Sequence, residues 1–121
     1  MVKRSVLLRL HDIRDAAAGI AETVAGVDFE AYRKAWRIRR ATERGIEIIS
    51  EASRHIPDSL KAGHPHLPWQ EIAAIGNVMR HEYARVEDKI VWRVTQKYLP
   101  DLDLASAIEA MIREIENQQS K

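Results

Sequence analysis

The sequence predicts an all-α, up-and-down bundle of about five helices, formed by a single domain over residues 1–121. Apolar residues recur at helical spacings of three and four through most of the chain. Neither the alternation typical of strands nor an internal repeat occurs. A length of 121 residues, with 45% apolar and 31% charged side chains, is typical of one globular domain.

Two apolar stripes predict the long helices of the first half. One stripe covers residues 6–24, and Gly26 is placed to end that helix. The other covers residues 38–56, and Asp28 is a suitable N-cap for the segment leading into it. Gly45 lies inside the second stripe, where glycine costs about 1 kcal/mol relative to alanine. We therefore expect a close helix–helix crossing at Gly45.

The second half combines a connector with three further helices. Three prolines and a glycine interrupt regular structure over residues 57–68, leaving space for one short helical turn. Helix resumes over residues 68–83, where the proline suits the first turn. Residues 86–99 and 102–115 form two more helical stretches, and we expect Pro100 to separate them.

Composition excludes several classes of site. The chain has no cysteine, which excludes disulfides, thiolate metal sites and cysteine nucleophiles. Its longest uncharged, mostly apolar run covers residues 72–79, far short of the roughly 20 residues of a membrane span. No secretory signal follows Met1, so we expect a cytoplasmic protein without a membrane partner. His64 and His66 have no further ligands at coordinating spacing, so no metal site is predicted.

A basic stretch covers residues 33–40, with five cations in eight positions around Trp36. Clustered cations with an interleaved aromatic can follow a phosphate backbone and stack on a base. The alternative is a solvated helix face whose arginines pair with Glu30, Glu43 and Glu47. The candidate RNA-binding residues are Arg37, Arg40, Arg44 and Arg85.

A second candidate site lies in residues 76–83, Gly-Asn-Val-Met-Arg-His-Glu-Tyr. Helical spacing puts Asn77 and His81 one turn apart. Imidazole transfers protons near neutral pH, and arginine holds a phosphate through two parallel hydrogen bonds. An amide, an imidazole, a guanidinium and a phenol within about two turns therefore indicate a phosphodiester site. The alternative is a helix end with ordinary polar residues.

This segment resembles the signature of the HEPN superfamily, in particular its HepT-like toxin branch, which reads Arg-Asn-x-x-x-His-x-Tyr. Asn77, His81 and Tyr83 match the signature in spacing. Neighbouring segments are similar as well, and the resemblance extends over about residues 7–112. These segments are 43–52, 68–69 and 88–92.

The resemblance implies a helical two-fold homodimer in which the motif helices of both subunits line one cleft. It also implies RNA cleavage without a metal ion or cofactor. His81 would act as general base or acid while the ribose 2′-hydroxyl attacks the adjacent phosphate. Asn77 would orient the substrate or the imidazole. Tyr83 occupies the position that a cognate nucleotidyltransferase antitoxin adenylylates to silence the toxin.

Two acidic residues of the second long helix, Glu43 and Glu47, are candidates for supporting the catalytic histidine. The alternative is that they form helix-surface ion pairs with Arg40 and Arg44, since these residues lie three positions apart.

One position departs from the signature, because Gly76 replaces its arginine. We expect Arg80, one turn further along the same face, to take over the phosphate-binding role. Its side chain would lean back over the surface that Gly76 leaves empty. The alternative is that Gly76 permits close packing while Arg80 pairs with Glu82 or Glu87.

The missing arginine leaves two functions open besides that of a toxin endoribonuclease. One is a non-catalytic HEPN-type module that binds nucleotides or RNA. The other is an oligomeric helical interaction protein in which the histidine has no chemical role.

Overall fold

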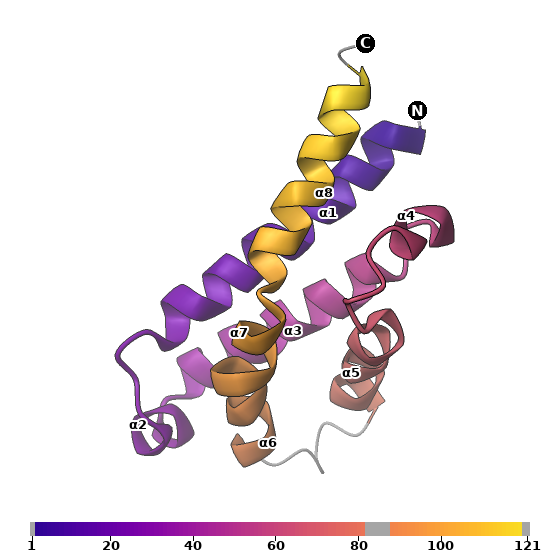
Figure 1. Ribbon diagram of the computed structural model, residues 1–121. Helices are drawn as coiled ribbons and strands as arrows, with labels where there is room; N and C mark the ends of the chain where they lie inside the picture. The colour runs from indigo at the N-terminus through magenta and orange to yellow at the C-terminus, as the bar shows by residue number, and fades with distance from the viewer. Residues whose placement is uncertain (1, 82–87, 120–121) are drawn as a thin grey trace.

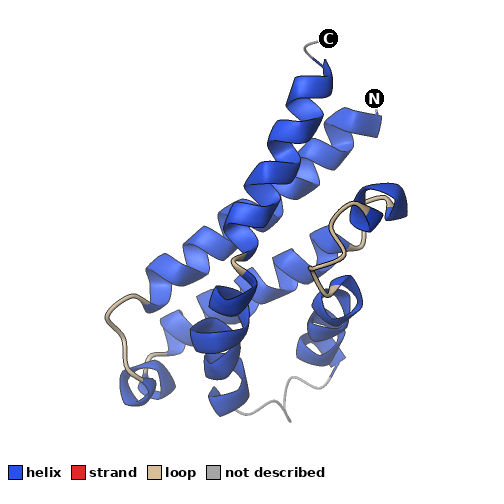
Figure 2. Cartoon of the chain, viewed as in Figure 1, coloured by secondary structure: helices blue, strands red, loops and turns tan. Residues whose placement is uncertain are grey.

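The computed structural model describes residues 2–81 and 88–119, and every regular element in these two ranges is helical (Figure 2). The predicted all-α class is therefore confirmed. In chain order the elements are α1 (Val2–Val24), α2 (Phe29–Lys34), α3 (Trp36–Ser53), α4 (Asp58–Ala62), α5 (Trp69–His81), α6 (Asp88–Arg93), the π-helical turn η2 (Val94–Tyr98), α7 (Leu99–Leu102) and α8 (Leu104–Gln119).

The long helices pack in sequence across the bundle. α1 and α8 lie side by side, and the start of α1 and the end of α8 are found at the same end of the molecule (Figure 1). α3 packs along α1, and α5 packs in turn against α3. At the opposite end lie α2, the end of α5 and the start of α6 (Figure 1). The motif helix α5 therefore points its last turn toward the end of the bundle where α6 begins.

The core is formed by the apolar stripes that the sequence predicts. Each long helix contributes side chains with almost no exposed surface, so burial of these stripes is the main stabilising term of the fold. The largest fully buried aliphatic side chains are Leu10, Ile13, Leu67, Val91, Ile108, Met111 and Ile112.

Three local predictions in the first half are confirmed. Gly26 follows the end of α1 with a φ of 72°, a left-handed conformation that glycine adopts without strain. Asp28 caps α2, because its carboxylate accepts a hydrogen bond of 2.8 Å from Ala31 N. Gly45 marks the crossing of α1 and α3, since a Cβ there would lie only 2.6 Å from Ile20 Cγ1.

The predicted break at Pro100 is wrong. Pro100 lies in the first turn of α7, directly after the π-helical turn. In that turn Leu99 N donates to Val94 O, five residues back, so the backbone is wider than an α-helix. The wider turn accommodates a proline ring that has no N–H to donate. The helix ends instead at Asp103, whose φ of 48° is left-handed.

The connector contains the one short turn expected from its sequence. α4 occupies its first half, and Leu67 near its end is buried against the core. Among the described helices, none combines the length and the apolar character that crossing a membrane requires.

Candidate functional site

Three of the predicted catalytic residues lie within the last five residues of α5. Asn77 is exposed and lies one helical turn before His81. Arg80 directly precedes His81 on the same helix. The side chains of Arg80 and His81 are not among those the structure describes. Tyr83 and Arg85 follow α5 in the sequence and lie outside the described residues.

Gly76, the position of the missing motif arginine, is buried against α3. Its backbone N–H donates a hydrogen bond of 3.0 Å to Ser50 Oγ. The Ser50 hydroxyl in turn donates a hydrogen bond of 2.7 Å to Ala73 O. A Cβ built on Gly76 would overlap the Ser50 side chain. The two helices therefore approach each other so closely here that no side chain fits at position 76.

This geometry contradicts the premise that Gly76 leaves empty surface, and it supports the close packing that the alternative predicted. The alternative's pairing of Arg80 with Glu82 or Glu87 lies outside the described residues. Gly76 leaves no empty surface for Arg80 to cover, because Ser50 fills that space. Glycine is present because α5 and α3 pack in close contact, as the alternative predicted. An arginine at position 76 would require α5 to move away from α3. If Arg80 contacts a phosphate, it does so from the last turn of α5 and not by filling the space at position 76.

A polar cluster joins α3 to the first residue of α6. Arg39 Nη1 lies 3.6 Å from Asp88 Oδ2, and both side chains are mostly buried. Tyr32 of α2 is fully buried beside them, and within the described residues its hydroxyl has no hydrogen-bond partner. Burial, with Glu43 and Asp88 nearby, raises the pKa of Tyr32 above its ordinary value. The cluster holds α6 against α3 at the end of the bundle where α5 ends.

Glu43 and Glu47 form the ion pairs that the alternative interpretation predicted. Arg40 Nη1 lies 3.2 Å from Glu43 Oε1, and Arg44 Nη1 lies 3.4 Å from Glu47 Oε2. Glu43 is nevertheless buried, with only 8% of its surface exposed. Burial raises the pKa of Glu43 above its ordinary value, although Arg40 and Arg39 act in the opposite direction.

The basic stretch is largely neutralised by neighbouring carboxylates. Arg33 Nη2 lies 3.0 Å from Glu30 Oε2. Arg39 pairs with Asp88, and Arg40 pairs with Glu43. Lys34 and Arg37 are exposed, and neither forms an ion pair with any residue the structure describes. Of the candidate RNA-binding residues that the structure describes, Arg40 and Arg44 are therefore paired, whereas Arg37 is exposed without an ion pair to any described residue.

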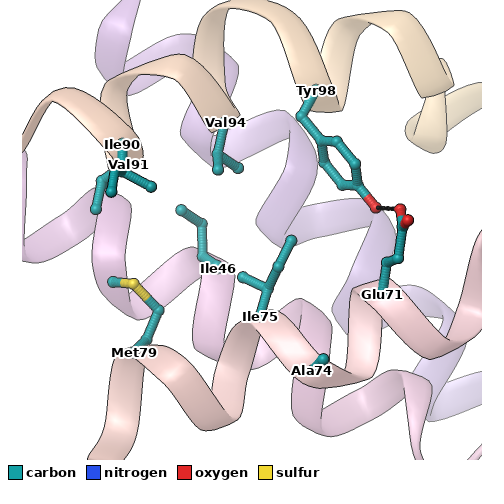
Figure 3. A pocket seen from close by; sticks show the side chains of 9 residues that line it. All are labelled: Ile46, Glu71, Ala74, Ile75, Met79, Ile90, Val91, Val94 and Tyr98. Carbon is teal, nitrogen blue, oxygen red and sulfur yellow. Dashed lines mark hydrogen bonds between the residues drawn. The ribbon is translucent and has the colours of Figure 1, made fainter. Parts of the chain in front are cut away.

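An apolar groove of about 420 Å³ opens between α5 and the segment formed by α6 and η2 (Figure 3). Met79 contributes to it two residues before His81, so the groove begins beside the motif end of α5. Ile90 lies at the groove with 56% of its surface exposed. The lining residues are Ile46, Glu71, Ala74, Ile75, Met79, Ile90, Val91, Val94 and Tyr98.

One polar pair closes the far end of this groove. The Tyr98 hydroxyl donates a hydrogen bond of 3.0 Å to Glu71 Oε2 (Figure 3). Burial and this contact raise the pKa of Tyr98 to about 12, so the phenol stays protonated as a donor. Sequence reasoning did not single out either residue. They lie 27 positions apart, and no spacing rule connects them.

Comparison with known proteins finds a ribonuclease family and relatives named as ribonucleases. The family model described as "Ribonuclease HepT-like" matches residues 13–112. The Thermococcus cleftensis protein named "Probable ribonuclease HepT" is 34% identical over 101 residues, covering 84% of this chain and 92% of the relative. The Methanocaldococcus jannaschii protein named "Putative RNase MJ1380" is 30% identical over 102 residues, covering 84% and 94%. No solved structure matches the chain.

The family match spans most of the chain, including the α3–α5 crossing, the motif helix and the groove. Its relatives are covered almost end to end, so the likeness extends to the whole domain. The chain belongs to the HepT-like ribonuclease family.

Proposed function

We propose that this protein is an endoribonuclease toxin that cleaves RNA without a metal ion. The proposal rests on the presence of three reactive side chains at the end of α5 in a chain of a ribonuclease family. The chain belongs to a ribonuclease family, and the end of α5 holds Asn77, Arg80 and His81 within five residues. Imidazole, guanidinium and amide groups supply the proton transfer and charge stabilisation that RNA cleavage needs.

In the proposed reaction, His81 accepts the proton of a ribose 2′-hydroxyl, and the 2′-oxygen attacks the adjacent phosphorus. The bond from phosphorus to the 5′-oxygen of the next nucleotide breaks, and that oxygen gains a proton. The products are a 2′,3′-cyclic phosphate and a 5′-hydroxyl. Arg80 stabilises the charge that develops on the phosphate oxygens, and Asn77 orients the substrate or the imidazole.

The proposed site lies in a cleft between two copies of the chain. The apolar groove supports this part of the proposal, because it exposes Ile90 and reaches Met79 beside the motif. A second copy that covers the groove would remove this apolar surface from water. A two-fold arrangement would bring His81 of both chains to one cleft.

Silencing by a cognate nucleotidyltransferase antitoxin completes the proposal, with Tyr83 as the residue that receives the adenylyl group. In this scheme the phenol oxygen attacks the α-phosphorus of ATP and pyrophosphate leaves. A bulky anionic group two residues from His81 would then compete with RNA phosphates for the same cations.

A second candidate is a non-catalytic module that binds nucleotides or RNA. The packing at Gly76 favours it, because the motif arginine is absent and Ser50 occupies the space at that position. The two candidates predict different behaviour of bound RNA, which is cleaved under the first and stays intact under the second.

Incubation of the purified chain with bulk RNA in excess chelator tests the proposal. We expect fragments ending in 2′,3′-cyclic phosphate, and none from His81→Ala. His55→Ala is the matched control, because His55 is exposed and pairs with Glu51 at 3.3 Å on α3. Binding of intact RNA without cleavage would favour the second candidate.

Growth arrest on expression of the parent, but not of His81→Ala, tests the toxin role.

A further inference from the structure

Trp36 differs from the other described aromatic side chains in its exposure. It is the first residue of α3, and 64% of its surface is exposed. Trp92 instead packs against Tyr32 with ring centres 5.0 Å apart, and also contacts Phe29. The indole of Trp69 is half-buried and donates a hydrogen bond to a backbone carbonyl. An exposed indole is costly in water unless something binds it.

One cation lies over this indole, and two more lie near it in the sequence. The guanidinium of Arg40, one turn later on α3, lies 5.9 Å from the centre of the Trp36 ring. Lys34 and Arg37 flank Trp36 in the sequence, are exposed, and have no ion pair within residues 2–81 and 88–119. A protein-binding tryptophan is normally ringed by apolar neighbours that exclude water. Here the neighbours are positively charged, which favours a polyanion that also carries flat rings.

The exposed indole lies at the same end of the bundle as the motif. Arg39, three residues after Trp36, pairs with Asp88 at the first residue of α6. The start of α3 and the start of α6 are thus tied together, and α5 ends on that side of the molecule (Figure 1). The start of α3 and the motif end of α5 therefore lie at one end of the bundle.

We propose that Trp36 stacks on a base of single-stranded RNA outside the cleavage cleft, while Lys34 and Arg37 contact the phosphates on either side of it. This inference rests on the proposed function, because it takes the RNA substrate as given. Stacking on an indole does not depend on base identity, since every base has a π-face. The site therefore contributes affinity for the strand and little sequence preference.

Tryptophan fluorescence tests the proposal on the full-length chain. In the His81→Ala background, which prevents turnover, we titrate a single-stranded RNA oligonucleotide of mixed sequence. We expect binding to quench the exposed indole, and the quenching to disappear in Trp36→Leu. Removal of one stacked base should weaken binding about five-fold or more. Trp36→Phe should restore part of the affinity, because a phenyl ring still stacks.

Leu8→Ala is the matched control, since Leu8 is an apolar residue of α1 with 60% of its surface exposed. It should bind RNA as the parent does. Equal RNA affinity of parent and Trp36→Leu overturns the stacking site, and so does quenching that persists in Trp36→Leu. Loss of the dimer in Trp36→Leu, with RNA affinity unchanged, would assign Trp36 to a protein interface instead.

The outcomes also separate this inference from the function on which it rests. If the parent cleaves RNA and Trp36→Leu has the same KM and kcat, the ribonuclease proposal stands and the stacking site is wrong. If the parent neither binds nor cleaves RNA, both proposals are wrong.

Discussion

The hydroxyl of Ser50 occupies the space beside Gly76, accepting a hydrogen bond from its backbone N–H and donating one to Ala73 O. Position 76 is therefore part of the contact between α3 and α5, and the polar groups at that contact are satisfied. The absence of the motif arginine is coupled to the way the two helices pack. Any phosphate-binding cation has to come from elsewhere in the chain.

Gly76→Ala should lower the free energy of unfolding by about 1–3 kcal/mol, measured by urea denaturation. The new methyl group meets both Cβ and Oγ of Ser50, and a Cβ cannot move without its backbone. Gly19→Ala is the control, because a Cβ there meets nothing within 4 Å. It should raise stability by up to about 1 kcal/mol through helix propensity. A Gly76→Ala variant as stable as the parent would contradict the close crossing.

Arg80→Ala should reduce RNA cleavage by about 10²-fold or more, comparable to His81→Ala, with little change in melting temperature. The reason is that Arg80 is the cation directly beside His81 on α5, and position 76 cannot supply one. Initial rates on a defined RNA, together with thermal melts of each variant, check this. Cleavage by Arg80→Ala at the parental rate would exclude Arg80 from the reaction.

Arg37→Gln should flatten the salt dependence of RNA binding by about 0.7 in the slope of log K against log salt, the value for one phosphate on a single strand. Arg37 has no ion pair within the described residues, so its charge is available to RNA. Arg33→Gln is the control, because Arg33 already pairs with Glu30 at 3.0 Å. Arg40 is a poorer probe, since its replacement would leave the buried Glu43 without its partner. Identical slopes for the parent and Arg37→Gln would assign the basic stretch to surface ion pairs.

Ile90→Asp should convert a dimer into a monomer, as measured by light scattering at micromolar concentration. A carboxylate in the apolar groove would have to lose its hydration when a second copy covers it. Leu8→Asp introduces the same charge at an equally exposed site on α1 and should leave the dimer intact. A parent chain that is already monomeric at this concentration would contradict the proposed dimer.

Glu43→Gln should gain stability relative to the parent as the pH rises from about 4 to 7. Burial raises the pKa of Glu43 above its ordinary value of 4.5. Between 4.5 and the raised pKa the folded state holds more protons than the unfolded state. The free energy of unfolding of the parent therefore decreases as the pH rises through this window. Glutamine does not titrate, so the variant lacks this decrease. Parallel stability curves for parent and variant would show that Glu43 titrates normally.

Sequence patterns determined those parts of the fold that depend on neighbours along the chain. The stripe over residues 6–24, the left-handed Gly26 and the Asp28 cap are local properties, and each is confirmed. The predicted helix break at Pro100 was wrong, because whether a proline ends a helix depends on the geometry of the preceding turn, which is π-helical here. The order Asn77, Arg80, His81 on one helix was likewise readable from the sequence.

Tertiary structure alone decided which way the motif helix faces. Helical periodicity gives the angles between side chains on one helix, but it does not say which angle meets another helix. Ser50 and Gly76 are 26 residues apart, and they meet only because α3 and α5 cross there. The Tyr98–Glu71 contact and the apolar groove arise in the same way. Packing between distant segments, rather than any local pattern, therefore explains why only glycine fits at position 76.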